Sequence, residues 1–186
     1  MSSFPVVLDA CVLAPYPLAN FLLWLAEEQT YRPLWSEHIL RETRGTMVNR
    51  LRVAEELADK RIAVMVENFI DAEVTGYAAL IPSMDNHEKD RHVVAAAVRE
   101  RAEVIVTFNL RDFPAKSLEP YHIKVLHPDD FLLDQLDLYP DATRRALYGL
   151  IESFTNPPFK PMQILTALGR GGVPKFAEAA RSLFEY

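Results

Sequence analysis

The chain has 186 residues, 49% of them hydrophobic, which is enough to form the core of one domain plus an appendage without disulfides. Its single cysteine, Cys11, excludes a disulfide framework and a multi-cysteine zinc site, and it predicts a reducing, cytoplasmic setting. The net charge of −6 excludes a nucleic-acid binder that is basic all over its surface, although clustered carboxylates can still meet phosphate through divalent cations.

The chain begins with two apolar stretches. Residues 4–8 (FPVVL) predict a strand buried on both faces, which ends on Asp9. The run 10–26 contains two prolines and is shorter than the roughly 20 apolar residues of a membrane-spanning helix. No Lys or Arg precedes Arg32, so the basic segment of a secretory signal is missing. We therefore expect a strand-to-helix passage and no membrane segment.

Strand and helix patterns alternate through the middle of the chain. Apolar runs predict further strands at residues 31–35, 72–76, 103–108 and 122–126. Helical patterns lie between the predicted strands, at residues 21–28, after Ser36 as N-cap, and at 53–71 and 88–101. This alternation predicts an α/β fold with a doubly wound parallel sheet flanked by helices.

The chain changes character after His127. Pro128, Pro140 and Pro174 each stand where a first helical turn can begin. We predict an α/β domain over residues 1–128, which would carry the chemistry, and a helical appendage of three or four short helices over 129–186. Its leucines recur at helical spacing, which indicates a packing role. The glycine cluster at 169–172 follows no strand, so it predicts a helix end rather than a phosphate-binding loop.

Polar residues follow two of the predicted strands. Asp9 comes directly after the first strand, and the stretch from Asn109 to Asp112 follows the strand at 103–108. Ligands of open α/β sheets bind outside the carboxyl ends of the strands, where these residues are expected. An aspartate in this position is equally often a turn or cap residue.

Two further acids lie on predicted helices. Asp90 is in line with Val94 and Ala97 on an apolar stripe, where a carboxylate is costly unless it is paired or coordinated. The alternative is a first-turn aspartate that the helix dipole favours, but this does not explain the inward direction. Glu42 flanks the apolar side of its helix, and only its association with the other acids makes it a candidate.

Carboxylates forced together repel one another unless a cation neutralises them. Mg²⁺ or Mn²⁺ suits an all-oxygen site, and two such ions can activate water and stabilise a leaving oxygen. The five histidines show no metal-binding spacing, and Cys11 is expected to be a buried small residue rather than a nucleophile.

Four segments, VVLDACVL, SEHILRE, KDRHVVAAAV and VIVTFNLRDFP, resemble the PIN domain in order and context, and are most similar to VapC-type toxins of bacterial toxin–antitoxin pairs. The resemblance covers about residues 4–127. It implies a Mg²⁺- or Mn²⁺-dependent ribonuclease that cuts single-stranded RNA to leave a 5′-phosphate and a 3′-hydroxyl. It also implies a homodimer that a cognate antitoxin holds inactive, with the appendage packing on the core or docking the antitoxin.

The resemblance assigns Asp9, Glu42 and Asp90 to the catalytic acids. The fourth acid is open between the position of Asn109 and Asp112, and we assign it to Asp112. Asp9, Asp90 and Asp112 would hold the metal, while Glu42 would complete the shell or orient the water. The expected supporting or phosphate-contacting residues are Ser36, Thr107, Asn109 and Arg111.

A basic run from Arg41 to Arg52 supplies three RNA-binding candidates, Arg44, Arg50 and Arg52. The alternative for this run is an ordinary solvated helix face. Two alternatives also stand for the function. A DNA or structure-specific nuclease would use the same acids, because nothing in the sequence identifies contacts to the 2′-hydroxyl. A non-catalytic interaction module on the PIN scaffold would have no reason to retain repelling acids.

Overall fold

Five short parallel strands form one sheet in the computed structural model, which describes residues 4–184. The strands are β1 (Pro5–Leu8), β2 (Arg32–Ser36), β3 (Glu73–Val74), β4 (Val104–Val106) and β5 (Lys124–Leu126). Their order across the sheet is β3-β2-β1-β4-β5, with β1 in the centre and β3 at one edge. The predicted doubly wound parallel sheet is confirmed, since the chain moves outward from β1 in both directions.

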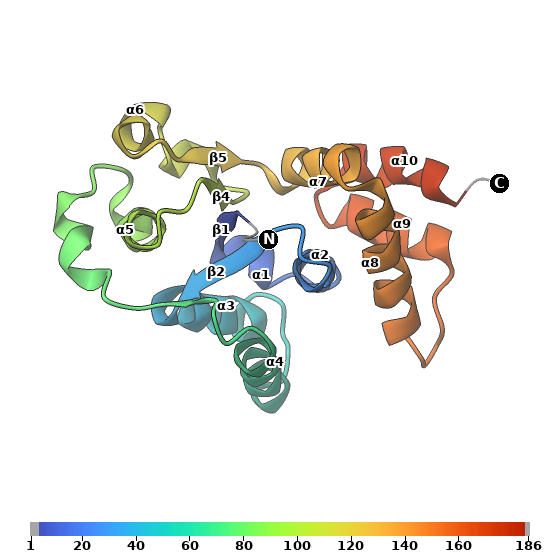
Figure 1. Ribbon diagram of the computed structural model, residues 1–186. Helices are drawn as coiled ribbons and strands as arrows, with labels where there is room; N and C mark the ends of the chain where they lie inside the picture. Colours follow the sequence, from blue (N-terminus) through green and yellow to red (C-terminus); the bar gives the residue numbers. More distant parts are fainter. Residues whose placement is uncertain (1–3, 185–186) are drawn as a thin grey trace.

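Helices cover both faces of this sheet (Figure 1). In the first 126 residues they are α1 (Ala10–Leu13), α2 (Leu18–Glu27), α3 (Glu37–Asn49), α4 (Glu55–Asn68), α5 (Arg91–Arg99) and α6 (Ala115–Leu118). The 3₁₀-helices of this part are η1 (Ala78–Ser83), η2 (Glu88–Asp90), η3 (Leu110–Asp112) and η4 (Glu119–Tyr121). Helix α5 packs on one face against β1, β2 and β4, whereas α2 lies on the other face.

The strand cores explain why β1 and β4 are neighbours at the centre. Val7 pairs in register with Ile105 on one side and with Leu34 on the other, and all three side chains are fully buried. Apolar residues without alternation suit a strand that helices cover on both faces. Because β1 and β4 run parallel, Asp9 and Asn109 follow them at the same edge of the sheet.

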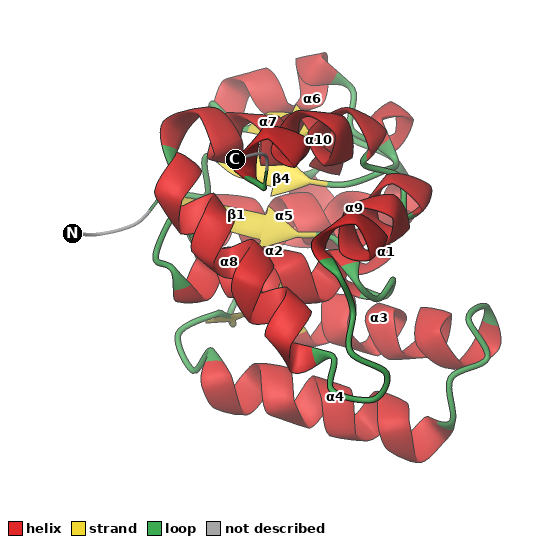
Figure 2. Cartoon of the chain, turned by 90° about the vertical axis from the view of Figure 1, so that its right-hand side faces the viewer, coloured by secondary structure: helices red, strands yellow, loops and turns green. Residues whose placement is uncertain are grey.

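Four helices complete the chain, and Figure 2 views the molecule from their side. They are α7 (Pro128–Leu138), α8 (Pro140–Ser153), α9 (Pro161–Arg170) and α10 (Pro174–Ala179), followed by the 3₁₀-helix η5 (Ala180–Leu183). Each of the four begins at a proline, as predicted for three of them. Helix α9 ends at Gly171, within the glycine cluster that predicted a helix end.

These C-terminal helices share a core with the sheet. Leu147, Leu150, Ile164 and Phe176 are fully buried in the same apolar cluster as the strand residues. Helix α8 lies so close to α2 that a Cβ atom on Gly149 would stand 2.8 Å from the Trp24 ring. The appendage therefore packs against the sheet domain, with α8 lying directly on α2. Among residues 4–184, no helix has the length and apolar character needed to cross a membrane.

Candidate active site

Four acids from four different elements line one open pocket at the carboxyl edge of the sheet. Asp9 follows β1, Glu42 lies on α3, Asp90 ends η2 and Asp112 ends η3. The pocket has a volume of about 720 Å³, and its wall consists of Asp9, Ala10, Cys11, Glu42, Gly45, Thr46, Asn49, Arg50, His87, Lys89, Asp90, Asn109 and Asp112. The acids that were predicted from separate segments thus share one cavity.

The carboxylate of Asp9 is held in place by three donors. It is 3% exposed, and its Oδ1 accepts a hydrogen bond from the backbone N–H of Ala10 at 2.7 Å, which caps α1. Its Oδ2 accepts from the Thr107 hydroxyl at 2.6 Å and from the Cys11 thiol at 3.2 Å. Asp9 is therefore both a helix cap and a pocket acid, and the two interpretations of its position are compatible.

Cys11 takes part in this network as a neutral thiol. Burial and the adjacent Asp9 carboxylate raise the pKa of Cys11 to about 12, although Thr107 and the N–H of Phe108 oppose the shift. The reactive form of a cysteine is the thiolate, which is scarce at such a pKa. The structure therefore supports the expectation that Cys11 is not a nucleophile.

Asp90 and Asp112 come together because the segment before α5 is tied to η3. The backbone N–H of His87 donates to the Asp112 carbonyl at 3.2 Å. Asp90 lies in the short 3₁₀-helix η2 rather than within the continuous helix predicted for residues 88–101, because that helix begins only at Arg91. Its side chain makes no capping hydrogen bond to α5, which argues against the alternative of a simple helix cap.

The acids of the pocket repel one another. Burial and, after it, the negative charges of the three neighbouring acids raise the pKa of Asp90 to about 6, while His87 opposes the shift. The Asp90 side chain is only 16% exposed, so water screens this repulsion incompletely. A carboxylate that is kept in such surroundings indicates a bound cation or a catalytic role.

Three histidines adjoin these acids in space, although the five histidines show no metal-binding spacing along the sequence. His87 Nδ1 lies 3.6 Å from Asp90 Oδ2, and ligand atoms of His87, Asp90 and Asp112 fall within 4.8 Å of one another. His38 and His92 flank Glu42 in a second group of the same kind. Sequence spacing alone carried one signal, since His38 and Glu42 are one helical turn apart.

Glu42 faces these histidines. Its Oε2 lies 3.3 Å from His92 Nε2, and its Oε1 lies 3.8 Å from His38 Nε2. Burial opposes the ionisation of Glu42, but the two histidines and a neighbouring arginine outweigh this and hold the pKa of Glu42 below its usual value. Glu42 is therefore an ionised group at the wall of the pocket.

The supporting residues predicted from the sequence divide into two kinds. Thr107 is fully buried behind Asp9, and Asn109 lines the pocket and donates its backbone N–H to the Thr107 hydroxyl at 3.0 Å. Ser36 is also fully buried, and its hydroxyl accepts from the N–H of Ile39 at 3.2 Å. The prediction that Ser36 is the N-cap of α3 is confirmed, and its supporting or phosphate-contacting role stays a prediction. Arg111 is exposed and lies outside the residues that line the pocket.

The basic run is divided as well. Arg50 lines the pocket. Arg44 does not line it, and instead forms ion pairs with Glu55 and Asp59 of α4. Arg52 is exposed beyond the end of α3 and is not part of the pocket wall either. Lys89 also lines the pocket. The cations at the pocket are therefore Arg50 and Lys89, while Arg44 is paired with α4 and its role in RNA binding stays a prediction.

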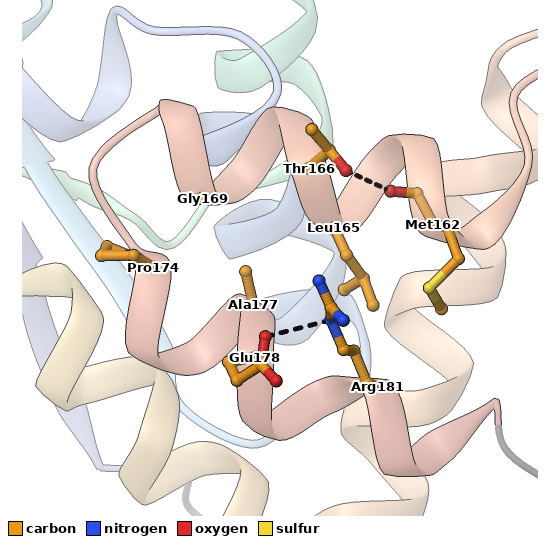
Figure 3. Close-up of a pocket in the computed structure, with 8 residues that line it drawn as sticks. All are labelled: Met162, Leu165, Thr166, Gly169, Pro174, Ala177, Glu178 and Arg181. Atoms are coloured by element: carbon orange, nitrogen blue, oxygen red, sulfur yellow. Dashed lines mark hydrogen bonds and ion pairs between the residues drawn. The ribbon is translucent and has the colours of Figure 1, made fainter.

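A separate hollow of about 410 Å³ lies between α9 and α10 (Figure 3). Its polar groups are already paired, since the Thr166 hydroxyl donates to the Met162 carbonyl at 2.7 Å and Arg181 meets Glu178 at 3.1 Å. Glu178 is the single carboxylate among its lining residues. The chemical groups that could act on a substrate are therefore gathered in the pocket of four acids.

Comparison with known proteins adds two family matches and one relative. The PIN domain model matches residues 5–111, and the VapC50 C-terminal domain model matches residues 128–182. A protein named "Putative ribonuclease VapC50", from Mycobacterium tuberculosis, is 62% identical over 109 residues. The alignment covers 59% of this chain and 64% of that protein, which is less than two thirds of its length. No solved structure matches the chain.

Proposed function

The chain belongs to the PIN-domain family, and on that premise we propose that it is a divalent-cation-dependent endoribonuclease and the toxin of a VapBC-type toxin–antitoxin pair. One observation supports the catalytic part above all others. Four carboxylates converge on one pocket, where burial and the charges of the other three raise the pKa of Asp90 to about 6, which costs stability unless the site serves a purpose. The name of the relative supports the choice of RNA and of the VapC class.

Asp9, Asp90 and Asp112 are the proposed ligands of the cation, which is Mg²⁺ or Mn²⁺. The donor set fits such an ion, because it consists of carboxylate oxygens whose mutual repulsion a cation would relieve. When bound, the ion would neutralise charge on the phosphate and activate water for an in-line displacement. The expected products are a 5′-phosphate and a 3′-hydroxyl.

The remaining residues prepare the pocket for this reaction. Thr107 holds Asp9 in a single orientation through its 2.6 Å hydrogen bond. Glu42 lies on the wall formed by α3, where it completes the ligand shell or orients the attacking water. Asn109, Arg50 and Lys89 present neutral and positive donors to the phosphates of the strand.

The division of the chain into residues 1–128 and 129–186 is part of the same proposal. The helices of the second part pack on α2 and hold no cluster of acids among their described residues. We propose that this part covers the core or docks the antitoxin and does no chemistry. We also propose that the active form is a homodimer and that a cognate antitoxin inhibits it.

The decisive experiment uses the purified full-length chain, stripped of metal and mixed with single-stranded RNA or DNA of matched sequence. Addition of Mg²⁺ or Mn²⁺ should start cleavage of the RNA, and a chelator should stop it. Mapping of the new 5′ ends would then identify the sites that are cut.

Each outcome separates the hypotheses. Undiminished cleavage in chelator would refute the cation mechanism. Preferential cleavage of DNA would favour the alternative nuclease, and absence of cleavage on either substrate despite metal binding would favour a non-catalytic interaction module. The control is Asp90→Asn, which should bind RNA but not cut it.

A further inference from the structure

A second cluster of potential metal ligands lies beside the acid pocket, on α3 and α5. His38 and Glu42 are one turn apart on α3, and His92 lies in the first turn of α5. The rings of His38 and His92 stack with their centroids 3.8 Å apart and their planes 13° from parallel. Two histidines and one carboxylate thus meet where α3 and α5 come together.

His92 is the unusual member of this cluster. Its side chain is 2% exposed, and neither ring nitrogen has a hydrogen-bond partner among the described residues. The Nε2 atom is 3.3 Å from Glu42 Oε2, near enough for attraction but not aligned for a hydrogen bond. Buried polar groups are nearly always paired, so an unpaired imidazole that faces a carboxylate indicates a missing ligand.

The separations between the ligand atoms fit a small cation. A four-coordinate ion with bonds of about 2.0–2.1 Å keeps its ligand atoms roughly 3.3–3.4 Å apart. His92 Nε2 lies 3.3 Å from Glu42 Oε2, His38 Nε2 lies 3.8 Å from Glu42 Oε1, and one ligand atom from each of the three residues falls within 4.8 Å of the others. Two stacked rings cannot both direct their in-plane lone pairs at one ion, so binding requires His38, whose side chain is 36% exposed, to turn out of the stack while burial fixes His92.

We propose that His38, Glu42 and His92 form a second cation site, selective for a transition metal of the Zn²⁺ kind, next to the aspartate pocket. Imidazole nitrogen favours Zn²⁺ and similar ions over Mg²⁺, which keeps to oxygen ligands. The three protein ligands leave a fourth position open to water or to a ligand. The site shares Glu42 with the proposed nuclease pocket, but its occupancy does not depend on the nuclease function, because metal binding can be measured without any turnover.

The test uses the metal-free full chain with both Asp9 and Asp90 replaced by Asn. This variant is titrated with Co²⁺ alone. This background disables the aspartate site, so Co²⁺ absorption in the visible region reports the histidine site. We expect one equivalent of Co²⁺ to bind with the intense absorption of a four-coordinate ion. Zn²⁺ should displace it, and an excess of Mg²⁺ should not.

Two substitutions then assign the ligands. His92→Phe keeps an aromatic ring in the buried position but removes both nitrogens, and His38→Phe does the same at the more exposed position. Each should weaken Co²⁺ binding at least about tenfold, as expected for the loss of one of three ligands. His122→Asn is the matched control, because His122 is exposed with φ of 56°, a conformation that Asn tolerates.

The proposal fails if the Asn background binds no Co²⁺, or if both Phe variants bind it as tightly as their parent. Circular dichroism in chelator checks that the variants are folded. If His92→Phe does not fold, His38→Phe alone decides the question, because its side chain is partly exposed.

Discussion

Two aspartates, the buried Asp129 and the half-buried Asp90, lie one in each region of the chain and have opposite surroundings. Asp129 begins the C-terminal helices and is 3% exposed, and its carboxylate accepts from the backbone N–H groups of Phe176 at 2.8 Å and Lys175 at 3.1 Å. It therefore satisfies the N-terminus of α10 and ties that helix to α7. Asp90, in the pocket, faces other carboxylates and has no capping hydrogen bond to α5.

This difference separates a structural carboxylate from a functional one. A buried acid surrounded by N–H donors stabilises the fold whether or not a ligand is present. A buried acid surrounded by other acids destabilises the fold until a cation arrives. Burial alone would have placed Asp129 ahead of Asp90 as a candidate for function. The partners of each carboxylate reverse that order.

The largest expected contrast is in cleavage. Asp90→Asn should lower the rate of RNA cleavage at least about 100-fold, because it removes a proposed metal ligand. Asp129→Asn should leave the rate within about twofold, because neither Asp129 nor α10 contributes to the wall of the acid pocket. Single-turnover cleavage at saturating Mn²⁺ measures both. Equal losses in the two variants would contradict the assignment of Asp90.

The second contrast is in stability, with the order reversed. Asp129→Ala leaves two buried N–H groups without an acceptor, so it should lower the free energy of unfolding by about 2 kcal/mol, or Tm by roughly 4–8 °C. Asp90→Asn in chelator should not lower the free energy of unfolding at all. Thermal and urea unfolding, each followed by circular dichroism, measure the difference. A stable Asp129→Ala variant would show that α10 needs no such anchor.

The third contrast depends on pH and concerns the metal-free protein. The pKa of Asp90 in the folded chain is about 6, above the 3.8 of an unperturbed aspartate, so folding favours its protonated form. Its ionisation therefore destabilises the fold, with no penalty below pH 3.8 and the full penalty above pH 6. Allowing for its partial exposure, Asp90→Asn should be more stable than the parent by about 1 kcal/mol at pH 7.5.

That advantage should shrink steadily as the pH falls from 6 to 4. Urea unfolding of both proteins in chelator across this range provides the measurement. A difference that stays constant with pH would mean that the ionisation of Asp90 is not its cause.

The smallest contrast is between Arg44, which lies on α3, and Arg50, which caps the C-terminal end of α3. Arg50→Ala should reduce the slope of log binding against log salt for RNA by about 0.7–1, because one phosphate contact is lost. Arg44→Ala should leave the slope unchanged, because Arg44 is paired with Glu55 and Asp59. Filter binding at several salt concentrations, with Asp90→Asn present to prevent cleavage, compares them. Equal slopes for both variants would mean that Arg50 contacts no phosphate and is part of an ordinary solvated helix face.

Much of the fold was predictable because the relevant signals are local. The apolar runs predicted β1, β2, β4 and β5, and the prolines predicted the starts of α7, α8 and α10. Each signal depends on a few neighbouring residues, such as a fixed φ at a first helical position. Pro161 provides the same signal at the start of α9.

The candidate site was predictable only in part, for a physical reason. Asp9 and Asn109 follow parallel strands, so topology alone brings them to one edge. Asp90 and Asp112 meet because the loop before α5 is hydrogen-bonded to η3. The bond joins His87 to Asp112, which are 25 positions apart in sequence. Similarly, the ion pairs of Arg44 could not be predicted, because its partners Glu55 and Asp59 lie on the next helix.

The sequence by itself determined the order of strands and helices, the apolar core and the residues that stand at strand ends. These follow from periodicity and from backbone preferences, which act within one element. Tertiary structure alone decided which polar side chains face one another. It paired Asp129 with α10, left Asp90 among acids, and placed His92 against Glu42 with both ring nitrogens unpaired. The energies of such groups depend on partners that packing brings from distant segments, so no local pattern encodes them.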